Sequence, residues 1–164
     1  MENRFRARGL RGRTLPAFPL FLPLVLMLCA AGCTGKYFKN VRPENKAEDV
    51  PFIPTFSWEA KRQVADLTFE LYRATDFDVE AKRPRGEPLL RVSGFPPTGG
   101  QEVRLSDVET LRTKLRSEGL FLTSGYDALK ASEDYVWVLR GMGPKEPFVE
   151  VYRFRTRRDY LRPD

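Results

Sequence analysis

Acidic residues in the middle of the chain are the first candidates for chemistry. Asp76, Asp78 and Glu80 alternate along a short run, and three carboxylates on one strand face are the oxygen ligands that calcium prefers. The run lacks the glycine turn and terminal glutamate of an EF-hand, and the basic residues within 82–85 follow it closely. We therefore predict no metal site, and we expect a solvated edge strand whose charges block unwanted strand pairing.

Histidine is absent from the whole chain of 164 residues. This absence excludes Ser-His-Asp and Cys-His nucleophilic catalysis, a histidine general base and every zinc site that needs imidazole. The acid–base route that remains is a pair of Asp or Glu carboxylates, which in glycosidases stand about 5–9 Å apart in a cleft. No such pair is visible in the spacing, so we predict no catalytic residues, no cofactor and no enzyme activity.

Two tryptophans, Trp58 and Trp137, have faces on which a sugar ring could stack. Both fall in strand-like runs of alternating apolar residues, where large aromatic side chains fill the space between two sheets. We therefore expect both indoles to be core residues. Tyr135 is predicted to tie a loop through its hydroxyl rather than to contact a ligand.

The carboxyl-terminal arginines are the remaining concentration of positive charge. Arg153, Arg155, Arg157 and Arg158 could bind anionic lipid headgroups or an acidic glycan, with about 1 kcal/mol from each arginine near a charged surface. A polar strand face that continues into a solvated tail is the alternative, and the one we favour. We predict no nucleic-acid partner.

The amino terminus has the charge pattern of an export signal. The full chain carries a net charge of +6, but residues 1–32 hold five arginines and one glutamate, so the rest is only +2, with 23 basic and 21 acidic residues. Residues 14–31 contain no charge, and a basic segment followed by an apolar one is typical of a secretory signal. Pro16, Pro19 and Pro23 argue against a membrane-spanning helix of roughly 20 residues.

The end of this segment resembles the lipobox of a bacterial lipoprotein precursor. Ala30, Ala31 and Gly32 precede Cys33 in the lipobox positions, although the commonest lipobox has leucine where Ala30 stands. The resemblance implies cleavage before Cys33, diacylglycerol on its sulfur and acylation of the new amino group. Anchoring would then be stable, at about 0.8 kcal/mol per buried methylene. Thr34 at the next position favours the periplasmic face of the outer membrane over the inner membrane.

The resemblance divides the chain into four parts. Residues 1–32 are the signal peptide, and 33–51 are the lipidated cysteine and a flexible tether, because 34–51 mix polar, charged and proline residues. Residues 52–156 form the folded domain, and 157–164 a basic tail. The discarded segment contains Cys29, so the mature chain keeps one thiol and no internal disulfide.

The folded part is predicted to be mainly β. Alternating apolar residues indicate two neighbouring strands at 54–58 and 65–73, with a polar turn between them, and a hairpin of a doubly buried strand at 134–139 with a last strand at 148–156. Shorter extended segments are expected at 88–92, 102–105 and 120–123. One helix over 106–118 has Ser106 as its capping residue.

These strands resemble fibronectin type III and related immunoglobulin-like domains. The resemblance depends on Pro54 and Trp58 in an early strand, the aromatic strand 68–72, the Tyr-x-Trp-x-Val run at 135–139 and the closing strand 152–156. It implies an immunoglobulin-like β-sandwich. The 106–118 helix departs from that pattern and is either an insertion or a sign of an α/β fold.

Together these features predict a non-enzymatic, lipid-anchored protein of the cell envelope. Its sandwich is expected to bind an envelope protein or cell-wall glycan, since an exposed edge strand can recruit a partner strand through main-chain hydrogen bonds. The alternative is a hydrolase of envelope polymers that uses an Asp/Glu pair.

Overall fold

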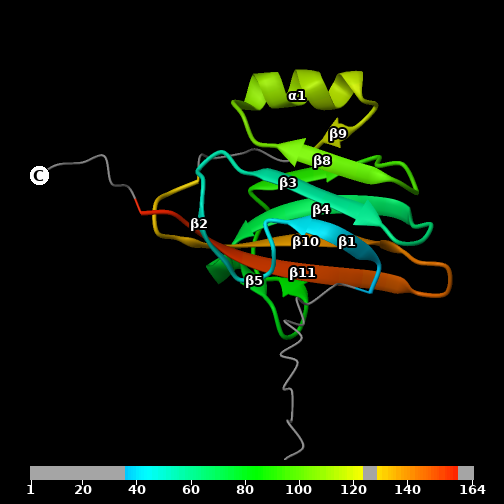
Figure 1. Ribbon diagram of the computed structural model, residues 1–164, viewed down its shortest axis with the longest axis horizontal. Coiled ribbons are helices and arrows are strands. Elements are labelled where there is room, and N and C mark those ends of the chain that lie inside the picture. Colours follow the sequence, from blue (N-terminus) through cyan, green and yellow to red (C-terminus); the bar gives the residue numbers. More distant parts are fainter. Residues whose placement is uncertain (1–35, 124–128, 159–164) are drawn as a thin grey trace, which may run out of the picture. The chain divides into compact units, whose positions relative to one another are not determined.

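The structure is a computed structural model that describes residues 36–123 and 129–158. The fold is mainly β, as predicted, and its described part contains one α-helix (Figure 1). Two sheets contain most of the strand residues, and a two-stranded ribbon completes the β structure. None of the described helices is long and apolar enough to cross a membrane.

The smaller of the two main sheets has three antiparallel strands in the order β1-β3-β8. These strands are β1 (Phe38–Arg42), β3 (Thr55–Ala60) and β8 (Gly100–Arg104). Alternation along β3 directs Phe56 and Trp58 to one face, as predicted, where they are 0% and 2% exposed.

The larger sheet has six strands in the order β2-β11-β10-β4-β7-β9. Its pairs are antiparallel except β2 with β11, which is parallel. The predicted hairpin is confirmed as β10 and β11. The strands are β2 (Ala47–Val50), β4 (Ala65–Arg73), β7 (Leu90–Ser93), β9 (Phe121–Leu122), β10 (Asp134–Met142) and β11 (Pro147–Thr156).

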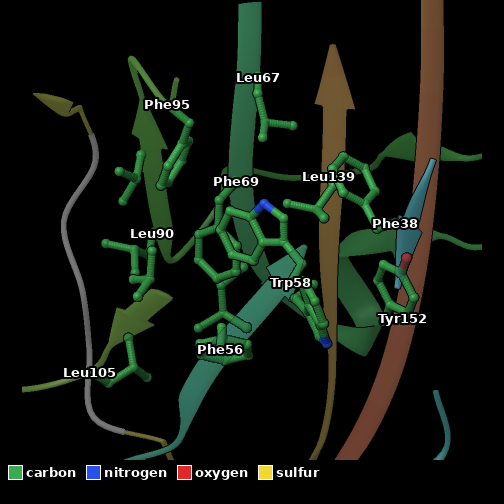
Figure 2. Close-up of a cluster of buried hydrophobic side chains, with 14 of the residues drawn as sticks. Phe38, Phe56, Trp58, Leu67, Phe69, Leu90, Phe95, Leu105, Leu139 and Tyr152 are labelled. Carbon is green, nitrogen blue, oxygen red and sulfur yellow. The ribbon is translucent and has the colours of Figure 1, made fainter. Parts of the chain in front are cut away.

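The two main sheets face each other across an aromatic core (Figure 2). The ring of Trp58 stacks on Phe69 with centroids 5.7 Å apart and planes 3° from parallel. Phe56 packs edge-on against Trp137 and Phe154, at 5.5 and 5.7 Å. These contacts join β3 of one sheet to β4, β10 and β11 of the other, and such ring pairs stabilise a fold beyond the area that they bury.

The outer face of the six-stranded sheet carries a second, smaller core. Val136 and Val138 of β10 pack there with Tyr72 and Phe77, so β10 is buried on both faces, as predicted. Phe77 belongs to the ribbon of β5 (Phe77–Asp78) and β6 (Arg83–Pro84). The expected edge strand over 76–80 is therefore wrong in extent, because only two of these residues pair as a strand.

The helix α1 (Val108–Ser117) lies within the predicted range of 106–118. Its capping residue is Asp107 rather than Ser106, because Asp107 Oδ1 accepts a hydrogen bond from the Thr110 N–H at 2.9 Å. Leu111 and Leu115 form its buried face. Figure 1 shows α1 beside β8 and β9, on the side of the sheets away from β11.

The predicted flexible tether is wrong for residues 36–50. Both β1 and β2 lie in this segment and pair with β3 and β11. Tyr37, Phe38 and Val50 are 4%, 0% and 7% exposed, so they belong to the core. The segment looked like a spacer because each short strand contributes few apolar residues, but those few are buried.

The predicted pairing of the strands at 54–58 and 65–73 is also wrong. They correspond to β3 and β4, which lie in different sheets. The connection crosses from one sheet to the other, and within it Val64 is buried and its N–H donates to Pro97 O at 2.9 Å. Placing the two strands face to face buries both of their aromatic rows in one core.

Candidate functional site

Half of β11 has a free side. β10 pairs along β11 from Pro147 to Arg155. On the opposite side β2 pairs only near the end, where Phe154 and Thr156 lie beside Ala47 and Val50. In the described part of the chain, no strand covers residues 147–152 on this side. We call residues 147–152 the open edge.

The main chain of the open edge presents hydrogen-bonding groups at regular spacing. Arg153 shows which main-chain groups of β11 face the β2 side. Its N–H donates to Asn45 Oδ1 at 3.0 Å, and its carbonyl accepts from Lys46 N–H at 2.6 Å. Alternate residues of a strand point their main-chain groups to the same side. The N–H and C=O groups of Val149 and Val151 therefore face the side that β2 leaves uncovered.

A groove of about 650 Å³ runs beside the open edge. Besides the strand, its walls come from the segment before β1, the β1–β2 loop, the loop after β5 and the β10–β11 turn. These contribute Lys36, Tyr37, Asn45, Val79, Lys82 and Glu146. Side chains from distant parts of the sequence thus surround an uncovered stretch of strand.

The outer wall of the groove is mostly apolar. Val149 and Val151 are half-buried on the outer face of β11, and both pack with Val79 on the second core. Lys82 adds one exposed cation to this wall. An extended segment placed along the open edge would meet valine side chains on this face.

The inner wall holds a carboxylate in a row of core residues. Glu150 lies between Phe148 and Tyr152 on the core-facing side of β11 and is half-buried. Its oxygens accept hydrogen bonds from the Tyr37 N–H and the Tyr152 hydroxyl, both at 2.5 Å. Burial, together with this bond to Glu150, raises the pKa of Tyr152 well above its usual range. Tyr152 therefore stays protonated and holds the carboxylate in place.

A second carboxylate at the groove is already neutralised. Glu146 forms an exposed salt bridge with Lys36 at 2.5 Å, and this contact holds the pKa of Glu146 below its usual range. By contrast, no lysine or arginine within 36–123 and 129–158 forms a salt bridge with Glu150. Among the residues that the structure describes, the inner wall therefore carries one half-buried carboxylate that no cation pairs.

Elsewhere, one buried acid on the outer face of the large sheet is fully engaged. Glu70, which is 4% exposed, accepts from Arg91 Nε at 2.9 Å and from Arg140 Nε at 2.8 Å. The Tyr72 hydroxyl also donates to it at 2.9 Å, and burial followed by the nearby Glu70 charge raises the pKa of Tyr72 to about 12. This cluster joins β4, β7 and β10, so its role is structural.

The predicted arginines do not form one pocket. Arg153 and Arg155 share the outer face of β11, but Arg155 binds its own chain, at 3.7 Å from Asp134 and 3.1 Å from Ser132 O. The guanidinium of Arg157 lies 5.1 Å from the ring centre of Phe52. Arg158 is exposed near the end of the described chain. This arrangement does not concentrate the four charges around one ligand.

The other predicted residues lie as follows. Trp58 and Trp137 are core residues, as predicted. The Tyr135 hydroxyl accepts from Lys130 N–H at 2.8 Å, so it ties a loop, also as predicted. Asp78 binds Arg85 at 2.8 Å, and no three carboxylates or thiols come together as a metal site in the described residues. Cys33 lies outside those residues.

Glu150 and the open edge are not among the predicted site residues. One signal in the sequence pointed to them, because Glu150 interrupts the aromatic, core-facing row of the last strand. Comparisons of the chain with protein-family models, curated proteins and solved structures find no match. The open edge with its groove is therefore selected as the candidate site on its own geometry.

Proposed function

We propose that this protein is a lipid-anchored binding protein of the cell envelope that takes up an extended segment of another envelope protein along the open edge of β11. The observation that carries the proposal is the row of main-chain groups at Val149 and Val151 beside a groove. An added strand would satisfy these groups and bury its side chains in the groove, which is how β-augmentation combines affinity with specificity.

We also assign the sandwich to the immunoglobulin-like or fibronectin type III class. The order β1-β3-β8 corresponds to strands A-B-E, and β11-β10-β4-β7 to G-F-C-C′. Tyr135 supports the assignment, since it lies near the start of β10 and its hydroxyl bonds to the main chain just upstream, as a tyrosine corner does. Helix α1 lies between the strands that correspond to E and F, where it is an insertion.

A protein partner fits the site better than a glycan. Binding of sugar rings commonly uses exposed aromatic faces, but Trp58 and Trp137 are almost fully buried. The open edge offers instead donors and acceptors at the repeat of an extended peptide. The spacing of main-chain groups therefore favours a polypeptide.

Binding also fits the groove better than polymer hydrolysis. A hydrolase with two carboxylates needs one of them protonated as a general acid, which requires a raised pKa. Glu146 has the opposite character, because Lys36 lowers its pKa and keeps it ionised at neutral pH. This argument supports a non-catalytic role.

The edge proposal is tested by cross-linking in the native cell. A photoreactive amino acid replaces Glu146, which is exposed and lines the groove, and mass spectrometry maps the adduct. We expect adducts with an extended segment of one envelope protein, and their loss when Val151→Pro removes an edge-facing N–H. Val151→Ala, which keeps that N–H, should retain the adduct.

The same photoreactive residue in place of Glu102 provides the position control, because Glu102 is exposed on another strand, β8. Equal adducts from both positions, or adducts that survive Val151→Pro, would contradict edge capture. Membrane attachment is tested separately with Cys33→Ser. This variant should appear in the soluble fraction and lack the acyl mass, and its retention in membranes would contradict the proposed anchor.

A further inference from the structure

We infer that the segment bound at the open edge carries a lysine or arginine opposite Glu150, flanked by apolar residues that face outward beside Val149 and Val151. This inference deepens the proposed function and rests on it. It names the chemistry of the partner, namely an extended peptide in which basic and apolar side chains alternate.

The first reason is the Glu150 carboxylate, which forms no salt bridge with the lysines and arginines of 36–123 and 129–158. Its carboxylate accepts from the Tyr37 N–H and the Tyr152 hydroxyl, both of which are neutral donors. Lys36, the cation at this end of the groove, is bound to Glu146. Two neutral donors leave the charge of the carboxylate uncompensated, so an incoming cation adds a Coulombic attraction that these donors do not supply.

The geometry of a paired strand supplies the second reason. Directly opposite residues on neighbouring strands have their Cβ atoms about 4.5–5.5 Å apart on the same face. A residue opposite Glu150 would therefore point to the inner wall, within reach of the carboxylate. Its two neighbours would point to the outer wall, where Val149, Val151 and Val79 form an apolar surface.

Charge also argues against a second copy of this chain as the occupant. Antiparallel pairing of two open edges centred on Glu150 would place one Glu150 carboxylate opposite the other. Like charges directly opposite each other destabilise a strand pair, and a second copy brings no unpaired cation in its inner row. A basic segment of a different protein removes this repulsion.

The test measures binding of short fluorescent peptides to the purified full chain in detergent. In one peptide valine alternates with lysine, in the second with glutamate and in the third with threonine. We expect the valine–lysine peptide to bind about tenfold more tightly than the valine–threonine peptide, as for a hydrogen bond to a charged group. The valine–glutamate peptide should bind most weakly.

Two matched variants locate the preference on one carboxylate. Glu150→Gln should abolish the preference for lysine, whereas Glu102→Gln, at an exposed glutamate of β8 that does not line the groove, should keep it. Thermal unfolding checks that both variants are folded. The comparison of the three peptides on the unaltered chain needs no variant, so the inference stays testable if Glu150→Gln does not fold.

Several outcomes overturn the inference. Equal affinity for the three peptides would show that the site does not select for charge. A preference for lysine that survives Glu150→Gln would show that Glu150 is not its cause. Neither result contradicts binding of a segment along the open edge. If no peptide binds, the inference also fails, and the cross-linking result decides separately whether edge capture fails with it. A dimer of the purified chain that Val151→Pro dissociates would assign the open edge to a second copy instead.

Discussion

At the scale of single residues, a glutamate and a tyrosine two positions apart recur at three places in this protein. The hydroxyls of Tyr72, Tyr135 and Tyr152 donate to Glu70, Glu133 and Glu150. Residues two apart in a strand share a face, so the pairs within β4 and β11 meet without help from another element, whereas Glu133 directly precedes β10. Burial is the main cause that raises the pKa of all three tyrosines.

These tyrosines predict a loss of stability in alkali. A tyrosine with a raised pKa in the folded state stabilises the fold fully below its unfolded pKa of about 10, and this contribution declines as the pH rises, because the unfolded chain loses the proton first. We expect the free energy of unfolding, measured with urea, to fall as the pH rises from about 10 towards 12, the folded-state pKa of Tyr72. Tyr152→Phe should make that fall shallower.

Tyr72→Phe provides the comparison for this prediction. The pKa of Tyr72 is raised to about 12, less than that of Tyr152, but both shifts act in the same direction. Both phenylalanine variants should therefore reduce the dependence on pH. If the free energy of unfolding falls as steeply with pH in Tyr152→Phe as in the unaltered chain, Tyr152 does not contribute to the loss of stability in alkali.

At the scale of elements, the centre of the large sheet depends on a close approach of two strands. The pairing of β10 with β4 is irregular between Arg140 and Met142, where Gly141 lies. A Cβ atom at Gly141 would meet Ala65 O at 2.8 Å and Leu67 Cα at 3.3 Å. These are main-chain atoms of β4, which cannot move aside as a flexible side chain can.

Gly141→Ala is therefore expected to lower the free energy of unfolding by about 1–3 kcal/mol, the usual cost of overpacking. Gly100→Ala in β8 is the matched control, because the nearest atom to its added Cβ lies at 4.0 Å. Urea unfolding of both variants measures the difference. Equal stability of the two variants would contradict this prediction, because it would mean that β4 and β10 can move apart to accommodate the added Cβ without loss of stability.

At the scale of the whole molecule, the core is completed by residues that precede the strands predicted from the sequence. Tyr37 stacks on Phe148 with centroids 4.3 Å apart, and Phe38 packs edge-on against the same ring at 5.6 Å. The segment from 36 to 50 thus places β1 on one sheet and β2 on the other. Within this segment, β2 pairs with β11 only at Phe154 and Thr156. Residues 147–152 therefore remain the open edge.

Phe38→Ala tests the role of this segment in the fold. Phe38 is fully buried, so the substitution should cost about 3–5 kcal/mol of unfolding free energy. Phe121→Ala, at a side chain that is 65% exposed, should change stability by no more than about 0.5 kcal/mol. If denaturant unfolding shows equally small effects, residues 36–50 behave as the predicted tether.

Local sequence patterns were enough to predict the long strands and their buried faces, but not β1 and β2. The ranges of β4, β10 and β11, the inward Trp58 and Trp137, and helix α1 could all be predicted. Each follows from a pattern within a few neighbouring residues, because alternation and helical spacing are properties of a single element. Glu150 was visible in the same way, as an acid in a core-facing row.

Apart from the hairpin of β10 and β11, the neighbours of each strand and the main-chain groups that stay uncovered became known from the folded arrangement. The separation of β3 and β4 into two sheets, the contacts of Glu70 with Arg91 and Arg140, and the partial cover of β11 by β2 all join distant segments. No local pattern encodes such pairings, because they depend on how the whole chain closes its core. The candidate site follows from this closure, since an edge is open only where no other segment reaches it.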